Sequence, residues 1–136
     1  MSKKRHVKVF VVASPDLKSI IPVEESVELN LALNSVKARC FTSYNLAKVS
    51  DTEEVDWEMK QTLTGAIISV CDAVAVVGSS LTTDMVDELK IAADEEKVIC
   101  CTSNLKDMIM QKKIPVSEKP LKVICQEALS SAVPAC

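Results

Sequence analysis

Three short apolar runs, separated by longer segments with helical periodicity, constrain the fold of this chain more than any other feature. The runs are Val7 to Ala13, Val74 to Val77 and Val98 to Thr102. Each is apolar nearly throughout and does not alternate with polar residues, which is typical of parallel strands that helices cover on both faces. A fourth, weaker strand is predicted from Lys37 to Thr42. We expect it nearer an edge of the sheet, because charged and apolar residues alternate within it.

The segments between these runs carry apolar residues at spacings near 3.6, the period of a helix with one buried face. The predicted helices span Pro22 to Val36, Asp51 to Val70, Thr83 to Glu95, Asn104 to Lys112, and a last segment that begins near Pro120. In the second of these helices, the residues expected to form the inward stripe are Val55, Met59, Leu63, Ile67 and Val70.

Strands that alternate with helices of this length form right-handed crossovers and a parallel sheet. We therefore predict an α/β fold, a single doubly wound domain of the flavodoxin-like or Rossmann-like kind spanning residues 1–136. Its parallel sheet should contain four or five strands, the first four in the order 2-1-3-4, with helices on both faces. Residues 1–6 are expected to form a flexible tail.

Composition excludes several classes of function. The chain has only two glycines among 136 residues, which argues against a glycine-rich phosphate loop. Its single histidine rules out a multi-histidine metal site within one chain, and we expect neither a metal nor another cofactor. The net charge is −3 and the basic residues are scattered, so we expect no binding to nucleic acid.

The cysteines and the hydropathy pattern indicate the cellular compartment in which the protein is expected. There are six cysteines, four of them inside apolar runs, where they resemble small buried hydrophobes. The sequence contains no C-x-x-C spacing and no apolar stretch of about 18 residues, and we expect no signal peptide. We expect reduced thiols in a cytoplasmic protein that does not associate with a membrane.

Ligands of doubly wound sheets bind beyond the carboxyl ends of the strands, at the point where the strand order reverses. Here that point lies between the first and third strands. The loop after the first strand offers Ser14 and Asp16 as ligand contacts, although a Ser-Pro-Asp turn without a ligand explains these residues equally well. The loop after the third strand offers a larger set of predicted contacts, Gly78, Ser79, Ser80 and Thr83.

The helix that follows this second loop begins with several carboxylates. Asp84 and Glu88 are four residues apart and share a helix face, so one could raise the pKa of the other if both are buried. We take both as candidate catalytic groups. The alternative for Asp84 is structural, because Asp84 and Asp87 also have the spacing of a helix N-cap and its acidic partner. Capping does not explain Glu88, which lies beside an apolar stripe.

These residues also carry a resemblance to a known family. The run from Cys71 to Gly78, the hydroxyl-rich loop, the Glu88-x-x-x-Ala92 spacing and the strand beginning at Lys97 resemble the nucleoside 2-deoxyribosyltransferase superfamily. The likeness is greatest to short, often phage-encoded members whose third strand follows Cys-Asp-Ala. It covers about residues 7 to 102, and residues 70 to 100 are its most specific part.

The resemblance implies a reaction. In that family a glutamate attacks the anomeric carbon of the sugar, an aspartate handles the proton of the base, and a tyrosine orients the nucleophile. Matched by position, Glu88 takes the place of the nucleophile. The place of the aspartate falls at Thr64, whose hydroxyl is no acid near neutral pH, with Asp56 two turns earlier as the alternative. Tyr44 is the only tyrosine, and it follows the second strand instead of the first.

Three hypotheses follow from these residues and from the resemblance. The first is a nucleoside or nucleotide N-glycosidase or deoxyribosyltransferase, with full or degenerate activity, acting on a small-molecule partner. The second is a non-catalytic module that binds a nucleotide or nucleotide signal, and the third is a structural oligomeric domain. A homo-oligomer, a dimer or tetramer, is expected in each case, because the helix from Asp51 to Val70 exceeds what a small sheet covers.

Overall fold

The computed structural model describes residues 6–14, 22–42, 57–101 and 105–132, with side chains from residue 62 onward in the helix that precedes the third strand, and up to residue 129 in the last helix. The described residues contain a four-stranded parallel sheet ordered β2-β1-β3-β4, which confirms the predicted fold class and strand order. Its strands are β1 (Val7–Ala13), β2 (Ala38–Phe41), β3 (Ala73–Val77) and β4 (Val98–Cys101).

The register of the strands leaves β1 and β3 projecting at the carboxyl edge of the sheet. The last residue of β2 is paired with Phe10, and the last residue of β4 with Val76. The central pair continues further, to Ala13 opposite Val77. Ala13 and Val77 therefore stand side by side at the edge, where the strand order reverses.

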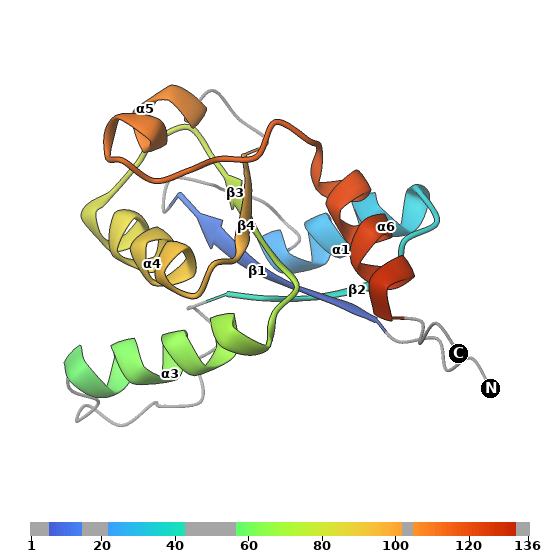
Figure 1. The fold of residues 1–136 in the computed structure, drawn as a ribbon, viewed down its shortest axis with the longest axis horizontal. Coiled ribbons are helices and arrows are strands. Elements are labelled where there is room, and N and C mark those ends of the chain that lie inside the picture. Colours follow the sequence, from blue (N-terminus) through green and yellow to red (C-terminus); the bar gives the residue numbers. More distant parts are fainter. Residues whose placement is uncertain (1–5, 15–21, 43–56, 102–104, 133–136) are drawn as a thin grey trace.

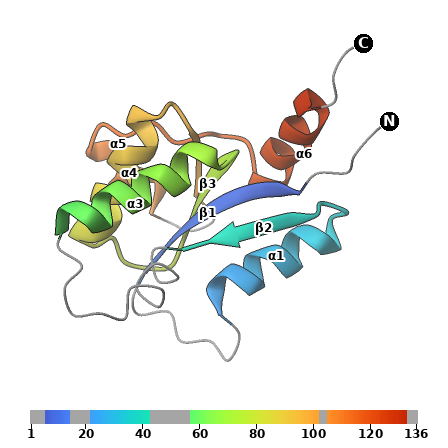
Figure 2. The same ribbon diagram turned by 90° about the horizontal axis from the view of Figure 1, so that it is seen from below.

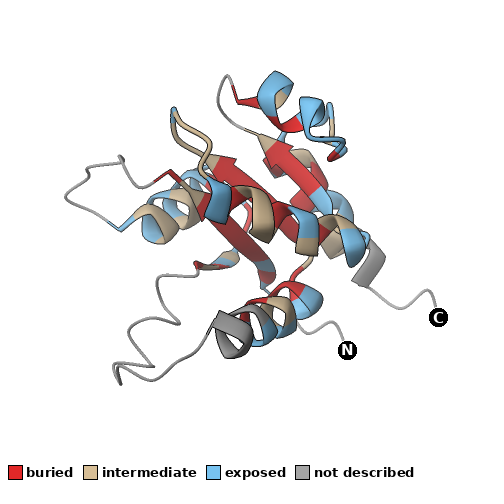
Figure 3. Cartoon of the chain, turned by 90° about the vertical axis from the view of Figure 1, so that its left-hand side faces the viewer, coloured by how far each residue is buried: buried red, intermediate tan, exposed pale blue. Residues whose placement is uncertain are grey.

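Helices cover both faces of this sheet, as predicted (Figures 1 and 2). Phe10 and Val12 of β1 belong to one apolar cluster, and odd-numbered residues of the same strand, such as Val9, belong to the other. The first cluster includes residues of α3, α4 and α5, and the second includes residues of α1 and α6. These helices span Val23–Leu33 (α1), Trp57–Val70 (α3), Thr83–Asp94 (α4), Lys106–Gln111 (α5) and Leu121–Ala132 (α6). The strands form the buried centre, whereas the outer sides of the helices are largely exposed (Figure 3).

The buried face of α3 differs from the predicted stripe. Leu63 and Val70 are 38% and 59% exposed, whereas Thr64 and Ile68 are buried. The prediction was right for Ile67, which packs against the core, and wrong for Leu63 and Val70. Apolar residues occupy both sides of this helix, so periodicity alone does not select the inner one. Packing against α4 selects it: a β-carbon at Gly65 would lie 3.7 Å from Cγ2 of Ile91. The side chains of Val55 and Met59 lie outside the described part of the chain.

Helix α1 also carries apolar residues on more than one side. Leu31 is buried, and Val23 and Val27 pack against its cluster. Leu29 and Leu33, by contrast, are 56% and 80% exposed. The buried face of α1 is thus narrower than its apolar content indicates.

Both outer strands have a contact on their free edge. The backbone N–H of Cys40 in β2 donates to Oε1 of Glu28 in α1 at 2.8 Å. On β4, the carbonyl of Ile99 accepts from the backbone N–H of Ser117 at 2.8 Å. Unpaired edge groups invite pairing with other chains. The sheet therefore satisfies edge groups on each side from its own helix or loop.

Three helices end in the left-handed conformation without the glycine that usually provides it. Ser35, Glu96 and Lys113 follow α1, α4 and α5 with φ of 63°, 58° and 64°. After α4, the N–H of Lys97 donates to the carbonyl of Ala92 at 2.9 Å, which closes the turn. Because the chain has few glycines, other residues adopt the left-handed conformation at these helix ends. This conformation costs each of them about 1–2 kcal/mol.

The described cysteines are free thiols, and four of them are buried. Burial raises the pKa of Cys40 and Cys125 to about 12, and that of Cys71 and Cys100 to about 11. Their thiols are therefore neutral near pH 7 and pack as small apolar groups. Cys136 lies outside the described residues.

Candidate functional site

The candidate site begins where β1 ends. The backbone N–H of Ser14 donates to the carbonyl of Val77 at 2.9 Å, which extends the pairing of β1 and β3 by one residue. The side chain of Ser14 is only 3% exposed. Ser14 therefore belongs to the end of the sheet, not to a solvent-exposed turn.

The hydroxyl of Ser14 holds the loop that follows β3. It donates to the carbonyl of Ser80 at 2.5 Å and accepts from the backbone N–H of the same residue at 3.2 Å. A serine hydroxyl has one proton, and here that proton is directed at Ser80. The two loops that the sequence placed at the switch point are thus in direct contact.

Gly78 makes this contact possible. Its φ is +130°, and a β-carbon built on it would lie 2.0 Å from Oγ of Ser14. No side chain fits at that distance, and few L-residues adopt that backbone conformation. Gly78 is therefore required for the chain to turn closely over Ser14. The next residue, Ser79, is exposed, and Ser80 is half-buried.

Helix α4 starts directly after this loop, and Thr82 is its N-cap. Oγ1 of Thr82 accepts from the backbone N–H of Met85 at 3.2 Å. The alternative in which Asp84 and Asp87 form the cap is therefore wrong. Thr82 precedes the helix in an extended conformation that aims its hydroxyl at the first turn, whereas Asp84 already lies inside the helix.

The two candidate carboxylates of α4 differ in environment. Glu88 is half-buried and its Oε1 atom is buried, next to the fully buried Leu89. Asp84 lies one turn closer to the start of the helix and is exposed. Thr83 is exposed as well. The condition for a coupled pair, that both carboxyls are buried, is not met. Glu88 is the carboxylate of α4 that reaches the protein interior.

The Cys-Asp-Ala segment that carries the resemblance has a structural role at the opposite end of β3. Oδ2 of Asp72 accepts from the backbone N–H of Lys8 at 2.9 Å, and the N–H of Asp72 donates to the carbonyl of Lys8 at 2.7 Å. Cys71 and Ala73 on either side are buried. Two of the three residues thus fill the core, and the third aligns the starts of β1 and β3.

The remaining predicted site residues fall into two groups. Thr64, at the place of the proton-handling aspartate, is buried in α3, which packs beside α4. Asp16, Tyr44 and Asp56 lie outside the described residues. The bond between Ser14 and Ser80 was not predicted, because nothing in the local sequence distinguishes a serine that bonds to a distant backbone from one that faces a ligand.

Among the described residues, no three His, Cys, Asp or Glu side chains come together in a way that would hold a metal ion. None of the helices in the described part of the chain combines the length and apolar character needed to cross a membrane. Compared with known proteins, the sequence matches no family model and no curated protein.

Proposed function

We propose that this chain binds a nucleoside or nucleotide at the carboxyl edge between β1 and β3, and that Glu88 is the nucleophile that cleaves or exchanges its N-glycosidic bond. The sheet order supports the location, because ligands of doubly wound sheets bind where the strand order reverses. The loops after β1 and β3 meet at this point through Ser14 and Ser80. Helix α4, which carries Glu88, begins three residues after Ser80.

The observation that carries the proposal is the partial burial of Glu88. A glutamate on a surface helix ordinarily extends into water. Here one carboxyl oxygen is held within the protein on the helix that leaves the switch point. A carboxylate restricted in this way keeps one orientation, which favours attack on a bound substrate.

The reaction is a displacement at the anomeric carbon. An oxygen of Glu88 forms a bond to that carbon, the bond to the base nitrogen breaks, and the electron pair leaves on the base, which takes up a proton from water. Water then hydrolyses the glycosyl ester to free sugar, or a second base accepts the glycosyl group. Thr64 supplies no acidic proton, so we expect turnover about 100- to 10,000-fold slower than with a carboxylic acid in its place.

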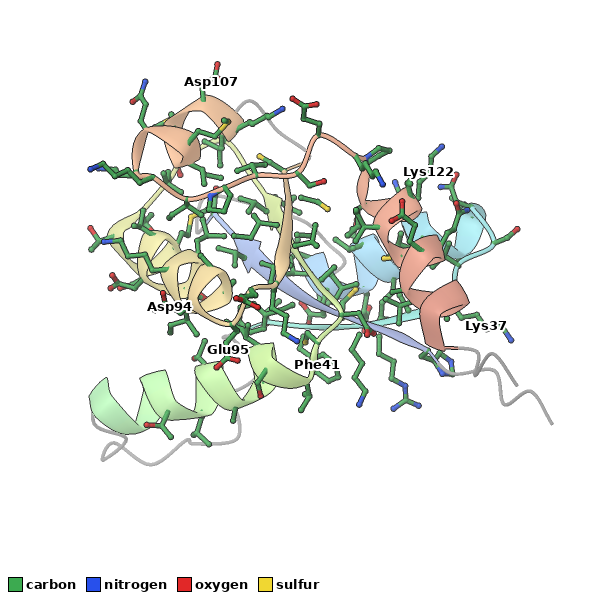
Figure 4. All side chains as sticks on the ribbon, in the orientation of Figure 1. Lys37, Phe41, Asp94, Glu95, Asp107 and Lys122 are labelled. Atoms are coloured by element: carbon green, nitrogen blue, oxygen red, sulfur yellow. The ribbon has the colours of Figure 1, made fainter. Side chains whose placement is uncertain are left out.

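Release of free base tests this proposal. The chain is incubated with deoxynucleosides and their 5′-monophosphates, and free base is separated by chromatography. Glu88→Gln should abolish the release, since the amide is no nucleophile. Asp94→Asn is the matched control: it removes the same charge from the exposed end of the same helix (Figure 4) and should leave the release unchanged.

A non-catalytic module for nucleotides is the second candidate, and the buried Thr64 favours it. A site that has lost its proton donor can still bind. In that case a nucleoside or nucleotide binds to both the natural chain and Glu88→Gln, and neither releases base. If none of these ligands binds, the third possibility remains, a structural oligomeric domain.

We further propose that the chain forms a cytoplasmic homo-oligomer through the outer side of α3. Leu63 and Val70 are exposed there, and residues 61–70 contain no charged side chain. An uncharged apolar face can meet its own copy without opposing like charges. Val70→Lys should shift the mass measured by light scattering toward the monomer. Lys122→Glu, an exposed charge change on α6, should not shift it (Figure 4).

A further inference from the structure

Ser14 makes three hydrogen bonds to the end of β3 and to the loop that follows it. Its N–H donates to Val77, and its hydroxyl both donates to the carbonyl of Ser80 and accepts from its N–H. One side chain therefore satisfies both backbone groups of a residue 66 positions away. The connection between β1 and β3 therefore continues beyond the last paired residues of the sheet, through the side chain of Ser14 instead of through backbone pairing.

The loop between these contacts has little freedom. Gly78 passes so close to Ser14 that no β-carbon fits, and the chain returns to the Ser14 hydroxyl at Ser80. Two residues later Thr82 caps α4 through the N–H of Met85. The first turn of α4 is therefore tied to the end of β1 by a short chain of hydrogen bonds, and Glu88 lies within the next turn of that helix.

The hydroxyl of Ser14 is poorly placed to touch a ligand. Its side chain is 3% exposed, and its only proton goes to the carbonyl of Ser80. The sequence placed Ser14 among the ligand contacts together with Ser79. The two residues differ in exposure, since Ser14 is buried whereas Ser79, in the loop after β3, is exposed.

We propose that Ser14 is a positioning residue: through Ser80 it sets the place where α4 begins, and so the place of the Glu88 carboxylate. This inference rests on the proposed function for the role of Glu88. It predicts that loss of the hydroxyl disturbs the chemical step while ligand binding is largely kept. Exposed Ser79, by contrast, affects binding.

Kinetics of base release separate these roles. Ser14→Ala should lower kcat about 10- to 100-fold, because small displacements of a reacting group have effects of this size, while KM changes less than about threefold. Ser79→Ala should raise KM with a smaller effect on kcat. A Ser14→Ala variant with raised KM and unchanged kcat would overturn the proposal, because it would identify Ser14 as a ligand contact.

Amide hydrogen exchange distinguishes a failure of this inference from a failure of the proposed function, since it needs no activity. In Ser14→Ala, the amides of Ser80 and Met85 should exchange at least about tenfold faster, while Val76 in β3 stays protected. If Met85 keeps its protection, the contact does not position α4 and the inference fails, whether or not the natural chain releases base. Ser14→Cys, with a weaker donor, provides the same comparison if Ser14→Ala does not fold.

Discussion

Asp72 and Lys8 are joined by a pair of hydrogen bonds, one to the Asp72 carboxylate at 2.9 Å and one from its backbone N–H at 2.7 Å. The pair aligns β1 and β3 one residue before their ladder starts at Val9 opposite Ala73. Because the carboxylate bond joins two central strands, we expect Asp72→Ala to lower the free energy of unfolding by about 1–2 kcal/mol. Urea unfolding measures this, with Asp94→Ala as an exposed control. Equal midpoints for the two variants would show that the Asp72 carboxylate has no role in alignment.

The two glycines should respond to the same substitution in opposite ways. Gly78→Ala forces a β-carbon to 2.0 Å from Ser14 at a positive φ, so we expect a loss of at least about 2 kcal/mol. Gly65 lies inside α3, and the β-carbon of Gly65→Ala would lie at an ordinary contact distance of 3.7 Å from Ile91 of α4. This substitution should raise the free energy of unfolding by about 0.5–1 kcal/mol. Thermal or urea unfolding of both variants checks the pair. A stabilising Gly78→Ala would contradict the close contact of the two loops.

Left-handed residues at helix ends offer stabilising substitutions. Glu96 and Lys113 are exposed and adopt φ of 58° and 64°. Glu96→Gly removes the steric cost of a β-carbon in that conformation, so we expect the urea midpoint to rise by the equivalent of about 0.5–1 kcal/mol. The control is Glu95→Gly, one position earlier, where φ is −84° and glycine should destabilise the helix end. If both variants lose stability, the conformation at Glu96 is not the one described.

The buried thiols make the free energy of unfolding depend on pH in the alkaline range. The pKa values of Cys40 and Cys125 are raised by burial to about 12, whereas unfolded thiols ionise near pH 9. The folded chain therefore binds more protons above pH 9, and its stability should fall as pH rises from about 9 toward 12. Each such thiol contributes at most about 1.4 kcal/mol per pH unit. Urea midpoints at pH 8, 9 and 10 test this. Cys125→Ala should show a smaller fall than the natural chain, and an identical fall would contradict the assignment.

The strands and their order could be predicted because apolar runs of strand length have one compact arrangement when helices alternate with them. The buried face of α3 could not, since apolar residues occur on both of its sides and only packing against α4 and β1 selects the side with Thr64 and Ile68. The cap of α4 was assigned to Asp84 in the structural alternative, and residue type alone could not correct this, because Thr82 and Asp84 are both good capping residues. Only the backbone conformation at Thr82 decides between them.

Within the candidate site, the sequence indicated which loops meet but not how. Ser14, Ser79 and Ser80 have the same local character, yet one is a buried contact between loops and another is exposed. The difference arises from strand pairing across 66 residues, which no local pattern encodes. Glu88 was singled out by its place beside an apolar stripe, and its partial burial agrees with that placement.

The central claim is that Glu88 forms a covalent bond to the sugar, and trapping that ester tests it most directly. The chain is mixed with a deoxynucleoside that it cleaves, quenched in acid and digested, and the peptide that contains Glu88 is examined by mass spectrometry. We predict a mass increase equal to one deoxyribosyl group on Glu88, present in Asp94→Asn and absent in Glu88→Gln. Base release that persists in Glu88→Gln, or a glycosyl group found on another residue, would contradict the account.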